Sequence, residues 1–306
     1  MADYYGTDTV VSELRENGLL IIRINRPDMA NALNGATSKA MENIMNNAET
    51  DPAVRAIIVT GTGKVFCAGE DLSELSEGGE CQTVTEHGFG GLTARTCSKP
   101  VIAACNGSAA GGGMEIALSC DMVVASERAK FGCTEVGLGI IPGANGCARA
   151  TAIVGPAKAK QLVMLTEMVP GKQAYDLGLL NWYVEGDAEL SAKAVEAKKA
   201  FKAAKKAGAE NLDELKAANK AAEAAAAKAE YDAIYAKAVE VAKTLMTKPA
   251  CALASAKAAI NKAAIETIAA GKAAETTEFT LLFNTHDQKE GMAAMIEKRP
   301  AVFTNN

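Results

Sequence analysis

Histidine is nearly missing from this chain, which has only His87 and His286 in 306 residues. Such scarcity argues against a metal centre built on several histidines. No C-x-x-C pair occurs among the eight cysteines, several of which lie in apolar runs such as "VIAAC" (101–105). We therefore expect reduced, buried thiols rather than disulfides or metal ligands, and no bound metal.

The sequence also lacks an excess of positive charge and any long apolar run. Its formal net charge is −5, whereas a general nucleic-acid binder needs a basic face to neutralise phosphates. A small anionic ligand held by a few lysines remains compatible with this balance. No stretch reaches the roughly 20 apolar residues of a membrane helix, and "MADYYGTDTVVSELRE" lacks the basic and apolar regions of a signal peptide. We expect a cytoplasmic protein with no membrane or nucleic-acid partner.

Short apolar runs alternate with helical patterns in the first half of the chain. Four runs are bounded by Gly, Pro, Asn or Asp and are typical of buried strands, at residues 18–24, 55–61, 100–105 and 121–126. A helical periodicity spans 38–50, and Asp51-Pro52 ends it. The pattern predicts an α/β arrangement to about residue 150, followed by mainly helical structure.

A segment rich in Ala and Lys runs from residue 188 to 245. Gly208 interrupts it, and "NLDE" (211–214) resembles a capping box that starts a new helix. We interpret the segment as an αα-hairpin; the alternative is a partly frayed, solvated helix.

Three motifs are candidates for the chemistry. "VFCAGEDL" (65–72) and "GSAAGGGMEIALSCD" (107–121) each follow a predicted strand, and "FGCTEVGLGIIPG" places Glu135 twenty residues after Glu115. Glycines at the start of a helix expose N–H groups that can hold an anion or a developing oxyanion. Taken singly, a triple glycine is more often a phosphate cradle or a site of close packing than an oxyanion hole, and Glu115 fits a capping or surface residue. The conjunction favours an oxyanion hole with two carboxylates.

These motifs, with "NRPDMANALN" and "DQKEGMAAMIEKRPAVF", resemble the crotonase (enoyl-CoA hydratase/isomerase) superfamily, closest to its two-glutamate hydratases. The resemblance implies an α/β, crotonase-like spiral of repeated ββα units with a helical C-terminal trimerisation region. It divides the chain into a spiral core (1–187), the Ala/Lys-rich insertion (188–247) and a C-terminal helical region (248–306). It also implies a homotrimer or a dimer of trimers.

The resemblance assigns roles residue by residue. Glu115 and Glu135 match the catalytic pair, and the backbones of Glu70 and Gly112 match the two oxyanion donors. Residues expected to bind substrate or CoA are Arg26, Ala30, Ala68, Asp71, Leu72, Gly111, Pro142, Gly143, Met295 and Lys298.

The implied enzyme is a lyase that hydrates a 2-enoyl-CoA, with the CoA thioester as substrate and no cofactor. Alternatives within the fold are double-bond isomerisation and thioester hydrolysis; outside catalysis, the alternative is an acyl-CoA- or RNA-binding member. Glu70 and Asn145 depart from the small residues usual at their positions. These departures favour a cyclic, branched or polar acyl group. The insertion is either an extended oligomer contact or CoA entrance, or a neutral surface addition.

Overall fold

The computed structural model describes residues 6–76, 84–207, 209, 211–261, 264, 280, 282–283 and 285–302, excluding the side chains of 75 and 76. Its main sheet has the order β1-β2-β3-β7-β9-β12. The strands are β1 (Val10–Leu14), β2 (Leu19–Ile24), β3 (Ala56–Gly61), β7 (Val101–Cys105), β9 (Met122–Ser126) and β12 (Trp182–Val184). β1 pairs antiparallel with β2, and the other pairs are parallel.

The four expected apolar runs correspond to β2, β3, β7 and β9, and their lack of polar alternation has a simple cause. Successive residues of a strand face opposite sides of the sheet. In β2, Leu20 and Ile22 join one buried cluster while Leu19 and Ile21 join another on the opposite face. Both faces are covered, so every position along β2 except Arg23 is apolar.

A second sheet has the order β11-β10-β8-β4, with β11 (Val169–Pro170), β10 (Lys130–Gly132), β8 (Ser108–Ala110) and β4 (Val65–Cys67). Its strands β4, β8 and β10 are mutually parallel neighbours and follow β3, β7 and β9 along the chain. Each is followed by a helical turn: α2 (Leu72–Ser76), α3 (Gly112–Ser119) and the 3₁₀ helix η2 (Glu135–Leu138). This repeated ββα order is the expected crotonase-like spiral, and it confirms the α/β fold class.

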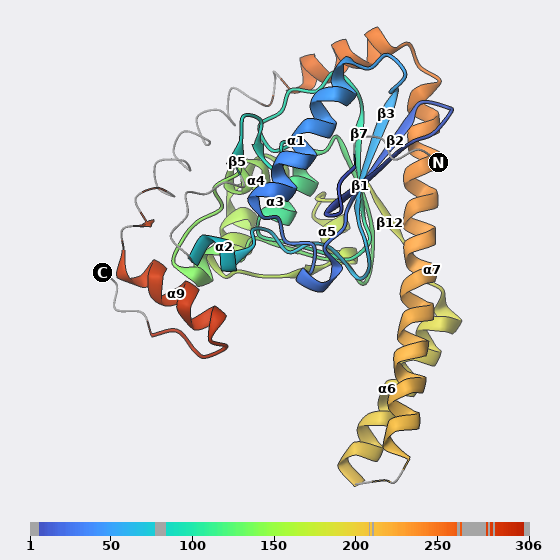
Figure 1. Cartoon of the computed structure of the whole chain (residues 1–306), viewed down its shortest axis with the longest axis vertical. Helices are drawn as coiled ribbons and strands as arrows, with labels where there is room; N and C mark the ends of the chain where they lie inside the picture. Colours follow the sequence, from blue (N-terminus) through green and yellow to red (C-terminus); the bar gives the residue numbers. More distant parts are fainter. Residues whose placement is uncertain are drawn as a thin grey trace.

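Further helices cover the core, and the hairpin β5 (Val84–Thr85) and β6 (Gly88–Phe89) lies beside α1 (Figure 1). They are η1 (Pro27–Met29), α1 (Gly35–Thr50), α4 (Gly146–Met164) and α5 (Gly171–Asp176). α4 is kinked next to Pro156, where Gly155 adopts φ 76° and ψ 162°. Trp182 and Tyr183 form the edge strand β12, which pairs with β9 and packs against the helices α5 and α7.

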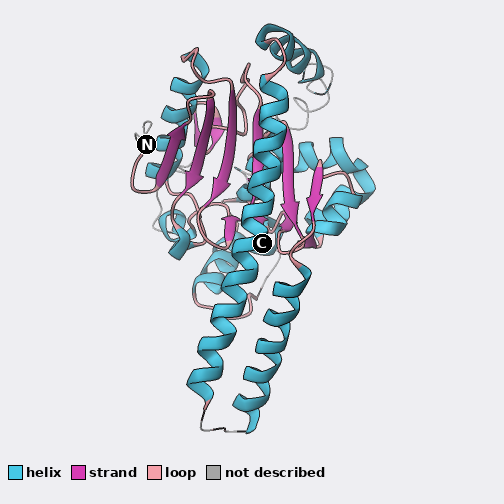
Figure 2. Cartoon of the chain, turned by 90° about the vertical axis from the view of Figure 1, so that its right-hand side faces the viewer, coloured by secondary structure: helices cyan, strands magenta, loops and turns pink. Residues whose placement is uncertain are grey.

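Two helices, α6 (Ala188–Ala207) and α7 (Leu212–Met246), run side by side in the Ala/Lys segment and extend past the sheet (Figure 2). Gly208 lies outside the described residues. Asn211 stands at the start of α7 but forms no side-chain capping bond within the described first turn. The second half of α7 covers the main sheet, where Ile234 and Ala238 join the cluster of Leu19 and Ile21. α7 thus packs both against α6 in the hairpin and against the main sheet.

The C-terminal helix α9 (His286–Ile296) returns to the core and packs against η2 and α2. Close contact requires glycine here, because a Cβ on Gly291 would lie 2.6 Å from the Leu138 carbonyl oxygen. No helix among the described residues is long and apolar enough to cross a membrane.

Candidate active site

A cavity of about 190 Å³ opens where β4, β8 and β10 end. Carboxyl ends of parallel strands meet at one sheet edge, and ligands bind there. The three candidate motifs follow these strands, so the fold brings them together. The cavity is lined by Ala68, Gly69, Glu70, Leu72, Val84, Phe89, Gly111, Gly112, Glu115, Thr134, Glu135, Leu138, Ile140, Gly143, Ala144 and Met295.

Two backbone N–H groups are candidates for an oxyanion hole. Gly112 is the first residue of α3, a position whose N–H has no acceptor inside its own helix. Glu70 pairs with Leu33 as a parallel bridge. Leu33 N donates to Gly69 O and Asp71 N donates to Leu33 O, both at 2.8 Å. In a parallel pair, one residue bonds to the two neighbours of the residue opposite it. Leu33 bonds to Gly69 and Asp71 in this way, so the N–H of Glu70 between them points away from Leu33.

Glycine is required where these two segments meet. A Cβ on Gly69, whose φ is +94°, would lie 3.0 Å from Gly112 N. On Gly113 it would lie only 2.0 Å from the Cys67 carbonyl oxygen. The triple glycine therefore provides both exposed N–H groups and close packing of α3 on β4.

Glu115 lies in the first turn of α3 with only 3% of its surface exposed. Its Oε1 accepts hydrogen bonds from Ala144 N and Gly146 N, each at 2.8 Å. The alternative of a surface glutamate is therefore wrong, whereas the bond from Gly146 N, the first residue of α4, is itself a capping contact. Two N–H donors on one oxygen favour the ionised form of a carboxyl group.

Glu135, the first residue of η2, is 8% exposed and lies close to Gly111, the residue before α3. A Cβ on Gly111 would lie 3.3 Å from Glu135 Oε1. The two glutamates thus line one cavity at the N-terminus of α3, together with Gly112.

The expected substrate-binding residues divide into two groups. Ala68, Leu72, Gly111, Gly143 and Met295 line the cavity. Ala30, Asp71, Pro142, Arg26 and Lys298 are not among the described residues that line it.

Arg26 is occupied within the chain. Its Nη2 lies 2.9 Å from Asp71 Oδ2, and its Nη1 donates to Ala32 O at 2.6 Å. Burial of Asp71 opposes its ionisation, but hydrogen bonds from Ser73 and Arg26 outweigh this and hold the pKa of the carboxyl below its usual value. A contact of Arg26 with CoA stays a prediction.

Sequence reasoning missed the far wall of the cavity, formed by Val84 and Phe89. A Cβ on Gly112 would lie 2.6 Å from Phe89 Cε1, so the ring packs directly on the oxyanion glycine. The available signal was the glycine-rich "HGFGG" (87–91). His87 does not appear among the described lining residues and contacts Glu42 instead.

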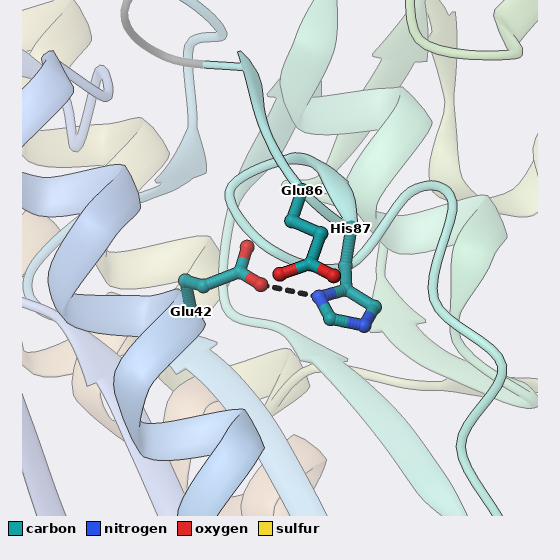
Figure 3. Close-up of side chains that lie close together, drawn as sticks. All are labelled: Glu42, Glu86 and His87. Carbon is teal, nitrogen blue, oxygen red and sulfur yellow. Dashed lines mark hydrogen bonds and ion pairs between the residues drawn. The ribbon is translucent and has the colours of Figure 1, made fainter.

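Glu42, Glu86 and His87 form the one group with metal-ligand spacing in the described part of the chain (Figure 3). Glu42 already accepts hydrogen bonds from Thr85 and His87, and Arg95 Nη2 lies 3.2 Å from its Oε1. Burial opposes ionisation of Glu42, but these partners outweigh it and lower the pKa of the carboxyl. We interpret these polar contacts as holding α1 against the segment that carries Phe89.

Residues 14–236 and 224–306 match the Enoyl-CoA hydratase/isomerase family. Short-chain-enoyl-CoA hydratase of Clostridium acetobutylicum is 35% identical over 93% of this chain and 94% of its own length. 2,3-Dehydroadipyl-CoA hydratase of Escherichia coli is 32% identical, covering 94% and 96%. The crystal structure of carnitinyl-CoA hydratase from Mycobacterium avium superposes with a TM-score of 0.77 at 30% identity, covering 98% of this chain and 100% of that one. The chain belongs to the enoyl-CoA hydratase/isomerase family and is an enzyme of acyl-CoA metabolism.

Proposed function

We propose that this enzyme is a lyase that adds water across the 2,3 double bond of an enoyl-CoA thioester, or removes it in reverse. The observation that carries the proposal is the joint placement of Glu115 and Glu135 on one small cavity beside Gly112. An isomerase needs a single proton carrier, whereas activating water and protonating carbon calls for two groups in unlike surroundings.

In the proposed reaction the thioester carbonyl oxygen accepts hydrogen bonds from Gly112 N and Glu70 N. Glu115 takes a proton from water, whose oxygen bonds to C3. The π electrons form an enolate, and its charge rests on the thioester oxygen against the positive end of α3. Glu135 then gives a proton to C2, and transfer of the proton on Glu115 to Glu135 resets the pair. The two N–H donors on Glu115 suit a carboxylate that begins the cycle ionised.

The acyl group is proposed to be short, and cyclic, branched or polar. A volume of about 190 Å³ suits a small acyl group, and Glu70 adds a third carboxylate residue to its lining. Curated relatives include a hydratase named for short-chain substrates, and the similar structure is a carnitinyl-CoA hydratase.

We also propose a cytoplasmic homotrimer or dimer of trimers, with Met295 and Lys298 near the adenosine part of CoA. Support comes from the family likeness, from the free buried thiols at Cys67 and Cys105, which suit a reducing compartment, and from Met295 on the cavity wall.

The test follows the absorbance of the conjugated enoyl-thioester across a panel of acyl-CoAs. Loss of the band indicates hydration, and a shifted band without loss indicates binding alone. Glu115→Gln and Glu135→Gln are each expected to lower kcat about 10²- to 10⁴-fold. Glu189→Gln on exposed α6 is the matched control, since the Glu189 side chain is 79% exposed. Near-normal turnover in either catalytic variant would contradict the paired assignment.

A further inference from the structure

Asn145 adopts a backbone conformation that favours glycine. It precedes α4 with φ 78° and ψ 17°, in the left-handed region, and it is only 4% exposed. A non-glycine residue is strained there, although asparagine tolerates it better than most. In the described part of the chain its Oδ1 also has no hydrogen-bond partner. Both features lower stability, and a glycine would carry neither.

One contact explains why the side chain is present. Asn145 Nδ2 donates to the Thr93 carbonyl oxygen at 2.8 Å in a buried environment. Asn145 and Thr93 line a second cavity, of about 570 Å³, and neither belongs to the lining of the cavity with Glu115. The Asn145 amide is therefore not among the described groups that line the proposed substrate cavity.

The position of Asn145 in the chain links it to Glu115. Its two neighbours, Ala144 and Gly146, supply both N–H groups that hold Glu115 Oε1. A Cβ on Gly146 would lie 2.9 Å from that oxygen, so the turn and the carboxylate are in direct contact. Fixing the middle residue of the turn fixes the direction of both donors.

Thr93 extends the connection to the opposite wall. Its Oγ1 accepts a hydrogen bond from Phe89 N at 2.8 Å, and its carbonyl oxygen also accepts one from Arg149 Nη2 at 3.2 Å. Phe89 packs on Gly112. A continuous set of contacts thus runs from the turn that holds Glu115 to the wall beside the oxyanion glycine.

We propose that Asn145 is a positioning residue: by tying the 144–146 turn to Thr93, it holds the main-chain donors that orient the Glu115 carboxylate. The proposal rests on the proposed role of Glu115 in hydration. Displacement of a catalytic group by about 1 Å can lower a rate about 100-fold, which sets the scale of the effect.

Asn145→Gly is the decisive variant, because glycine accepts the left-handed conformation without strain and removes only the tie. We expect kcat for enoyl-CoA hydration to fall about 10- to 100-fold with KM changed less than about twofold. The acidic limb of the kcat–pH profile should move to higher pH, since less well-aligned donors favour the carboxylate less. Asn145→Asp keeps the size but points an oxygen at the Thr93 carbonyl, and it should lower kcat at least as much.

Asn31→Gly is the matched control. Asn31 is also buried and left-handed, with φ 55°, and its Nδ2 donates to Thr62 O and Val65 O, but it is not among the residues lining the cavity. The Asn31→Gly variant should lower the thermal unfolding temperature without moving the acidic limb of the kcat–pH profile.

Asn145→Gly with wild-type kcat and pH profile, while Glu115→Gln is inactive, would overturn the positioning role and leave the proposed function intact. Wild-type turnover in Glu115→Gln would instead overturn the proposed function itself.

Discussion

Gly113→Ala tests whether the packing of α3 on β4 sets the distance between the two oxyanion donors. The added Cβ would lie 2.0 Å from the Cys67 carbonyl oxygen and 2.7 Å from its carbonyl carbon. Both are backbone atoms, which no rotamer change can move aside. Gly112 N belongs to the displaced helix, while Glu70 N belongs to the turn that follows Cys67.

The size of the effect follows from that distance. Real Cβ atoms essentially never lie within 3.0 Å of another atom, so the helix and strand must separate by about 1 Å. Such overpacking costs about 1–3 kcal/mol of stability. A 1 Å error in position costs about 100-fold in rate, comparable with the loss of one oxyanion donor. We expect kcat/KM to fall about 100-fold in a protein that still folds.

The assay pairs urea unfolding with the loss of enoyl-thioester absorbance. Gly137→Ala is the control, because a Cβ there meets nothing closer than the Thr166 methyl carbon at 3.7 Å. A Gly113→Ala enzyme that loses stability but keeps the wild-type kcat/KM would refute the link between this packing and the donors.

Three further outcomes are expected. Because the pKa of Glu42 is lowered in the folded protein, its carboxylate stabilises the fold fully above the ordinary pKa of 4.5, and this stabilisation is lost as the pH falls through the lowered pKa. The urea midpoint of Glu42→Gln should therefore fall less than that of the wild type between pH 6 and strongly acidic pH. An equal fall in both proteins would contradict this. With three carboxylate residues and no basic residue among the described lining of the cavity, an enoyl-CoA carrying a terminal carboxylate should show kcat/KM about 10-fold below a neutral chain of equal length. Glu70→Gln should raise kcat/KM for the carboxylate-bearing substrate relative to the neutral one. An unchanged ratio of the two values would show that Glu70 does not cause the difference. Burial raises the pKa of Cys67 to about 12, so iodoacetamide should alkylate exposed Cys251 in the native enzyme and leave Cys67 unmodified, as mass spectrometry will show; equal labelling would contradict its burial.

The strands were predictable because burial on both faces of the sheet requires a short, nearly continuous run of apolar residues in the sequence. A strand covered on both faces is apolar at nearly every position, and β2, β3, β7 and β9 end within a residue of the expected runs. β12 was not predictable in this way, because its three residues are only partly buried and it pairs with β9 at the edge of the sheet. Its existence depends on the position of β9, which short-range patterns do not contain.

The candidate site was predictable to the level of which residues gather. Glu115 and Glu135 follow neighbouring parallel strands, and the twist and order of a sheet bring such positions to one edge. Phe89 was not predictable from that rule, because it reaches the cavity through a two-stranded hairpin clamped to α1 by Glu42. A contact that depends on a hydrogen bond between Glu42 and His87, 45 positions apart in the chain, has no local signature in the sequence.

Asn145 illustrates a further limit of sequence reasoning. A departure from glycine next to a catalytic turn suggests a side chain that points into the active site, and the substrate then becomes the natural explanation. The left-handed backbone instead directs the amide to Thr93, on the far side of the turn. The departure is therefore informative about how Glu115 is held, and the acyl group must be inferred from residues that do line the cavity, chiefly Glu70 and Phe89.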